Sequence, residues 1–146
     1  MSNRYLPVAL RKAIIERAEG CCEYCPCQQK FSPDTFAAEH IIPQFLNGDD
    51  SMENLAFSCQ GCNSHKATAI DAIDSLTNTS VPLYNPRLSV FDEHFEWNSD
   101  FTLLIGKTPT GRATIQRLQL NRPYVVNLRY ALFISKNHPP EHFKRA

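Results

Sequence analysis

The chain has 146 residues, of which 42% are hydrophobic and 21% are charged. This size and balance are typical of a globular protein that buries a core of its own, and they exclude a disordered or collagen-like chain. No run approaches the roughly 20 apolar residues of a membrane span, and the amino terminus lacks the apolar stretch of a signal peptide. We therefore expect a soluble cytoplasmic protein.

The charges are unevenly distributed, although 15 basic and 15 acidic residues give a formal net charge of zero. Residues 107–146 hold eight basic residues and one acid, so this segment carries +7 and the rest of the chain carries −7. Contacts of lysine and arginine with phosphates supply most of the non-specific affinity of proteins for nucleic acid. The distribution therefore suits a nucleic-acid partner, although a solvated helical face gives the same pattern.

The first half of the chain predicts a helix, a hairpin and a second helix. Residues 7–18 begin with a proline, which the first turn of a helix tolerates, and continue with an apolar face. A glycine follows them at position 20, so the segment indicates a helix. Residues 36–42 and 55–58 are short apolar runs on either side of the turn-forming sequence Asn47-Gly48-Asp49-Asp50, which predicts two strands joined by a long loop. The spacing of apolar residues over 63–73 favours a helix.

The second half predicts a connection, another hairpin and two helices. Residues 77–86 are polar and contain prolines, as in a surface connection. Residues 94–98 and 101–106 predict a hairpin. The last two expected helices are residues 111–120, capped by Thr110, and residues 123–135, which begin with a proline.

All six cysteines lie between positions 21 and 62, and this clustering favours metal binding over disulfides in a cytosolic chain. Four of them form two C-x-x-C pairs separated by 33 residues, Cys22 with Cys25 and Cys59 with Cys62. Four thiolates match a closed tetrahedral zinc shell, which has no open position and is therefore structural. Cys27 could replace Cys25 as a ligand, and Cys21 has no assigned role.

Three short segments follow the first cysteine pair. Glu39-His40-Ile41-Ile42-Pro43 and Asn54-Leu55 lie between the two pairs, and Cys62-Asn63-Ser64-His65-Lys66 begins at the last cysteine. His40 precedes Asn54 by 14 residues, and Asn54 precedes Asn63 by nine. Together with the two cysteine pairs, this pattern resembles the HNH endonuclease motif over about residues 20–70. Glu39 stands where many relatives have Asp and Asn63 where some have His, and both can still bind a metal ion. Residues 83–87, 93–97 and 108–114 resemble a companion segment of stand-alone bacterial HNH proteins.

The resemblance implies a ββα-metal fold stapled by zinc. We therefore expect an α+β protein, with an HNH core and its zinc site over residues 1–76. A basic hairpin and helical extension over residues 77–146 would pack on this core as one compact domain. The resemblance also implies metal-dependent hydrolysis of phosphodiesters, with double-stranded DNA as the default target and with 5′-phosphate and 3′-hydroxyl ends.

The residue types support the same chemistry. Histidine is the side chain whose ordinary pKa lies nearest neutrality, so His40 is the candidate general base. Glu39 and Asn63 offer hard oxygen ligands, which suit Mg²⁺ or Mn²⁺ better than zinc. The resemblance implies that Asn54 braces the loop and orients His40. Neighbouring residues of an ideal strand point to opposite faces, so Glu39 and His40 can share a cleft only where the strand is irregular.

Further residues are candidates for contact with substrate. Lys66 is placed to meet a phosphate, and His65 is either another such contact or an alternative to Asn63 as a metal ligand. Arg87 and Arg112 are candidate phosphate contacts in the second half of the chain.

Two other function classes compete with the nuclease hypothesis. A non-catalytic zinc module would bind nucleic acid or a protein without cutting, and Glu39 and His40 would then be replaceable. A thiol redox protein would titrate its cysteines with two electrons and hold no stoichiometric zinc. The sequence leaves open whether the target is DNA or RNA, its strandedness, any sequence preference, the biological role and whether the protein forms a dimer.

Overall fold

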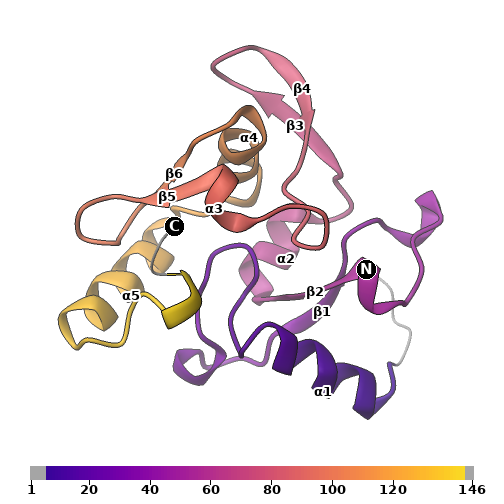
Figure 1. Ribbon diagram of the computed structural model, residues 1–146, viewed down its shortest axis with the longest axis horizontal. Coiled ribbons are helices and arrows are strands. Elements are labelled where there is room, and N and C mark those ends of the chain that lie inside the picture. Colours follow the sequence, from indigo (N-terminus) through magenta and orange to yellow (C-terminus); the bar gives the residue numbers. More distant parts are fainter. Residues whose placement is uncertain (1–5, 144–146) are drawn as a thin grey trace. The chain divides into compact units, whose positions relative to one another are not determined.

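The computed structural model describes residues 6–143, and these fold into two compact units that divide between Ile70 and Asp71 (Figure 1). The division comes before the expected boundary at residue 76, because residues 71–74 form a strand that pairs with a later strand of the second unit. No helix among residues 6–143 is long and apolar enough to cross a membrane.

The first unit is a hairpin with one helix before it and one after it. Its elements are α1 (Val8–Arg17), β1 (Ala37–His40), β2 (Leu55–Ser58) and α2 (Gln60–Lys66). Strands β1 and β2 are antiparallel, with Ala37 opposite Ser58 and His40 opposite Leu55. All four residues of β2 are buried, and Ile14 on α1 is also buried. The expected helix at residues 7–18 and the expected hairpin are confirmed.

The helix expected over residues 63–73 is wrong at both ends. Cys59 has an extended backbone, and its sulfur accepts the backbone N–H of Cys62 at 3.4 Å, so α2 begins three residues earlier. Ala67 ends the helix with a φ of 50°, while its own N–H still bonds to the carbonyl of Asn63. The α2 helix is therefore short and starts at the second cysteine pair.

The second unit contains two hairpins, three α-helices and a short 3₁₀ helix at Glu141–Phe143 within the described part of the chain. The strands and α-helices are β3 (Asp71–Asp74), β4 (Thr79–Pro82), α3 (Phe91–His94), β5 (Phe95–Trp97), β6 (Leu104–Gly106), α4 (Pro109–Leu118) and α5 (Pro123–Ile134). The expected β5–β6 hairpin and both late helices are confirmed, whereas the connection expected over residues 77–86 contains β4. Thr108 caps α4 by accepting the N–H of Gly111 at 3.0 Å, and Thr110, the expected cap, donates to the carbonyl of Pro82.

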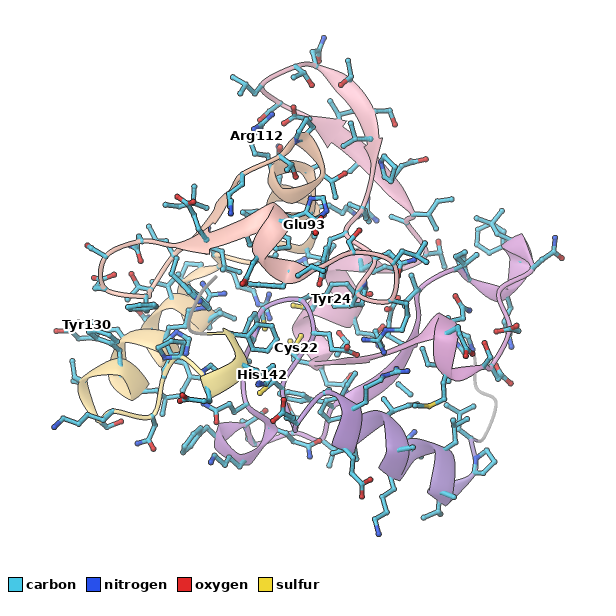
Figure 2. All side chains as sticks on the ribbon, viewed as in Figure 1. Cys22, Tyr24, Glu93, Arg112, Tyr130 and His142 are labelled. Atoms are coloured by element: carbon cyan, nitrogen blue, oxygen red, sulfur yellow. The ribbon has the colours of Figure 1, made fainter. Side chains whose placement is uncertain are left out.

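Aromatic rings and one ion pair hold this second unit together. The ring of Phe95 lies 4.7 Å from that of Phe91 and 5.2 Å from that of Tyr84, measured between centroids. Arg112 on α4, labelled in Figure 2, forms two hydrogen bonds of 3.0 Å to the buried carboxylate of Asp74 on β3. The pair fixes the β3–β4 hairpin to α4.

Candidate active site

Four cysteines of the first unit form a buried cluster. The sulfur atoms of Cys22, Cys25, Cys59 and Cys62 all lie within 4.8 Å of one another. The sulfurs of Cys25 and Cys59 are 3.7 Å apart, and four sulfurs placed about 2.3 Å from a central zinc would be separated by about 3.8 Å. The donor set and its spacing therefore fit a structural zinc ion.

The remaining two cysteines lie outside this cluster. Cys27, the expected competitor of Cys25, is half-buried and does not belong to the group of four. Cys21 is buried, and this burial raises the pKa of its thiol to about 12. The cluster uses the two C-x-x-C pairs and no other cysteine of the described residues.

The first cysteine pair is bonded to the hairpin through the residues between its cysteines. The backbone N–H of Glu23 donates to the carbonyl of Phe57 on β2 at 2.9 Å, and the carboxylate of Glu23 accepts the N–H of Phe57 at 2.8 Å. Tyr24, labelled in Figure 2, is buried two residues after Cys22, and its hydroxyl donates a hydrogen bond to Glu39 at 2.8 Å. The zinc site and the candidate catalytic carboxylate are thus joined by one buried side chain.

Glu39 is buried, with 2% of its surface exposed, and both of its carboxylate oxygens accept a hydrogen bond. One oxygen accepts from Tyr24, and the other lies 2.6 Å from the ammonium nitrogen of Lys66. Burial raises the pKa of the Glu39 carboxyl, while Lys66 and Tyr24 favour its ionised form. Lys66 is buried too, and it also donates to the carbonyl of Ile41 at 3.0 Å. This internal position differs from the phosphate contact that the sequence predicted for Lys66.

His40 is the last residue of β1, and its imidazole meets a carboxylate from the loop that follows. Its Nε2 lies 2.7 Å from Oδ1 of Asp50. The two side chains are 14% and 24% exposed, so the contact is largely shielded from water. Sequence reasoning placed Asp50 only in a turn. An acid in a turn-forming run gives no sign of which way its side chain points, so no local signal could have assigned it.

Asn54 braces the same loop from the start of β2. Its amide oxygen accepts the N–H of Ile42 at 2.9 Å, and its amide nitrogen donates to the carbonyls of Ile42 at 3.0 Å and of Asp49 at 2.9 Å. Gly48 allows this close approach, because a Cβ at that position would lie only 1.7 Å from the carbonyl oxygen of Ile42. The side chain of Asn54 thus joins the two ends of the loop between residues 42 and 49.

A cavity of about 310 Å³ opens beside these groups, lined by Glu39, His40, Pro43, Gln44, Phe45, Asn63, Ala67 and Thr68. Glu39 and His40 line it together although they are strand neighbours, because β1 ends there. Asn63 reaches the cavity from α2, while His65 is exposed on the same helix and is not among the lining residues. Each carboxylate oxygen of Glu39 has a second lone pair beyond its hydrogen bond, and carboxylate and amide oxygens are the donor types that hard divalent cations prefer.

The second unit holds the two remaining candidates. Arg112 is paired with Asp74, and together with Thr77 it holds the pKa of the Asp74 carboxyl well below its usual range. Its guanidinium is therefore engaged inside the unit, in place of the expected phosphate contact. Arg87 is half-buried in a turn, where its backbone N–H donates to the side chain of Asn85 at 2.8 Å.

Comparison with known proteins agrees with this geometry. The family model of the HNH endonuclease matches residues 22–68, which run from the first cysteine of the cluster to the last residue lining the cavity. Residues 22–68 are an HNH domain. An HNH domain is a nuclease-type domain. The predicted family and the predicted α+β fold class are both confirmed.

This chain has a distant relative in the Septu protein PtuB of Bacillus thuringiensis, to which it is 25% identical over 115 residues. The match covers 77% of this chain and 41% of that protein, so the chain spans less than half the length of this relative. The matched stretch is longer than the first unit, so the similarity continues into the second. No solved structure matches the chain.

Proposed function

We propose that this protein is a metal-dependent HNH endonuclease that hydrolyses phosphodiester bonds in double-stranded DNA. The observation that carries the proposal is the cavity that Glu39, His40 and Asn63 line together. These three side chains offer one group able to accept a proton and two able to ligate a hard cation. Their grouping supports phosphodiester hydrolysis better than it supports a thiol redox reaction.

In the proposed reaction, His40 accepts a proton from the attacking water. The new bond forms between the water oxygen and the phosphorus, and the bond from phosphorus to the 3′ oxygen breaks. The leaving 3′ oxygen takes a proton from solvent water, which gives 5′-phosphate and 3′-hydroxyl ends. A Mg²⁺ or Mn²⁺ ion held by Glu39 and Asn63 would stabilise negative charge on the phosphate and on the leaving oxygen. Asn54 keeps the loop beside His40 in place.

Lys66 and Arg112 have a supporting role in this proposal. Lys66 favours the ionised form of Glu39 and holds one of its carboxylate oxygens, while Tyr24 holds the other, and Arg112 ties the β3–β4 hairpin to α4. We propose that the contacts with phosphate come instead from other cations, including the exposed His65, the half-buried Arg87 and the basic residues of segment 107–146 other than Arg112 and the buried Arg129. The zinc ion held by the four cysteines has a structural role.

The test is cleavage of supercoiled plasmid by the wild type and by His40→Ala, at equal zinc content. Each protein is assayed with Mg²⁺, with Mn²⁺ and after removal of free divalent ions. Glu53→Gln, at an exposed position outside the cavity lining, is the matched control. We expect the wild type and the control to cut only with added metal, and we expect His40→Ala to be at least about 10²-fold slower.

Two results would contradict the proposal. Equal cutting by the wild type and His40→Ala would mean that His40 is not the base or that the activity is a contaminant. Binding of DNA by an inert wild type, with every metal tried, would instead favour the non-catalytic zinc module.

A further inference from the structure

We propose that Asp50 is a positioning residue, which holds the proton of the His40 imidazole on Nε2 and so leaves Nδ1 as the atom that accepts a proton from water. The catalytic consequence rests on the proposed function above. The tautomer itself does not, because it follows from the contact between the two side chains.

The chemistry of the contact fixes the direction of the hydrogen bond. An ionised carboxylate can only accept, so at 2.7 Å the Nε2 atom of His40 has to donate to Oδ1 of Asp50. A neutral imidazole carries one proton, so the second ring nitrogen then has a free lone pair. When Nδ1 takes the proton of the attacking water, the ring becomes positive and the Asp50 carboxylate lies against it.

The loop between β1 and β2 is built to hold this contact. Asn54 binds Ile42, two residues after His40, and Asp49, the residue before Asp50. The Asp49 carboxylate accepts the N–H of Ser51 at 3.0 Å and its hydroxyl at 2.6 Å, which closes a turn around Asp50. The residues on both sides of Asp50 are therefore fixed, and its side chain is directed at His40.

An ordinary surface ion pair would lack these features. Exposed pairs keep many rotamers and contribute little. The partners here are mostly shielded, and Asn54 bonds the loop that carries Asp50 to Ile42, two residues after His40. At metal sites, mutating a residue that hydrogen-bonds to a first-contact side chain commonly costs about 10- to 100-fold in activity, and we take the same scale for Asp50. The loop thus orients the imidazole of His40 as well as holding it beside the cavity.

The direct test is nitrogen NMR of the histidine rings in the zinc-loaded protein, recorded at about pH 8.5, where ordinary imidazoles are neutral. The chain has five histidines, and His40→Gln identifies the His40 signals by their loss. We expect the wild-type ring to carry its proton on Nε2. In Asp50→Asn the amide can donate to Nε2, so we expect the proton to move to Nδ1. Glu53→Gln makes the same charge change three residues away and should leave the tautomer unchanged.

Kinetics then measure the consequence for cleavage. We expect Asp50→Asn to lower kcat by about 10- to 100-fold with little change in KM, and Asp50→Glu to recover part of the loss. An identical tautomer in wild type and Asp50→Asn would overturn the proposal, as would a changed tautomer with an unchanged kcat. A wild type without cleavage would refute the proposed function alone, because the NMR result would still decide whether Asp50 sets the tautomer.

Discussion

Replacing Lys66 by methionine tests how the buried ion pair supports the site. The substitution keeps the approximate length of the side chain and removes its charge. It leaves the Glu39 carboxylate buried with the hydroxyl of Tyr24 and without its ammonium partner 2.6 Å away. It also removes the donor that the carbonyl of Ile41 accepts at 3.0 Å. Because both partners of the pair are almost fully shielded from water, solvent cannot replace what is lost.

The expected cost depends on pH. Removing one partner of a buried ion pair costs about 3–5 kcal/mol in the free energy of unfolding. Glu39 can avoid part of this cost by binding a proton, because burial already raises the pKa of its carboxyl and the loss of Lys66 raises it further. The unfolded chain binds that proton only once the pH falls to the ordinary glutamate pKa of about 4.3 or below. Between these two pKa values the folded variant holds the extra proton, so its stability falls as pH rises, by up to about 1.4 kcal/mol per pH unit.

The assay is urea unfolding of zinc-loaded wild type and Lys66→Met from pH 5 to pH 8. Release of zinc to a coloured chelator reports the unfolding of the first unit. We expect a penalty of about 4 kcal/mol at pH 8 that is clearly smaller at pH 5. Adding Glu39→Gln should restore much of the stability at pH 8, because no buried charge then remains. Lys12→Met, at an exposed position on α1, is the control and should change little.

The reasoning about this pair would be refuted by a penalty that is the same at pH 5 and pH 8. A double variant that is no more stable than Lys66→Met at pH 8 would be equally damaging. Either result would mean that Lys66 is not the counter-ion that keeps Glu39 ionised.

Three further predictions concern zinc and the second unit. Cys62→Ser should lose the bound zinc and the ordered structure of the first unit, while Cys27→Ser keeps both, as metal analysis and circular dichroism would show. Arg112→Met should lower the melting temperature of the second unit at pH 7, and this difference should shrink below about pH 4, because the depressed pKa of Asp74 stabilises the fold only while the carboxyl is ionised. Trp97 fluorescence would follow that unfolding. Burial lowers the pKa of His138 to about 4, so the second unit should lose stability as pH falls from about 6.5 to 4, and an NMR titration should find the midpoint near the lower value.

The sequence alone predicts the elements whose structure depends on local patterns. The first helix, the β1–β2 hairpin, the β5–β6 hairpin and the two late helices follow from proline positions, apolar runs and turn residues. The cysteine spacing was sufficient to predict the metal-binding cluster, because two C-x-x-C pairs have few other functions in such a chain. The order of Glu39, His40, Asn54 and Asn63 was sufficient for the family.

Contacts distant in sequence account for most of what was missed. Lys66 looked like a surface cation because Glu39, its partner, is 27 residues away, and Arg112 did so because Asp74 is 38 residues away. Strand β3 looked helical because its apolar spacing suits either structure, and only its pairing with β4 decides between them. The start of α2 depends on the sulfur of Cys59, which caps the helix. Helix propensities do not include capping by a cysteine sulfur, so the sequence did not predict this start.

The order in which the first unit's residues occur has a consequence for its synthesis on the ribosome. The first cysteine pair and β1 leave the exit tunnel well before their partners, because β2, the second cysteine pair and α2 all lie between positions 55 and 66. Until that stretch emerges, a nascent chain has half of a metal site, an unpaired strand and an unneutralised Glu39. Once it does emerge, zinc, the hairpin and the Lys66 ion pair become available almost together. A growing chain should therefore pass abruptly from an unstructured state to one that has the complete cavity.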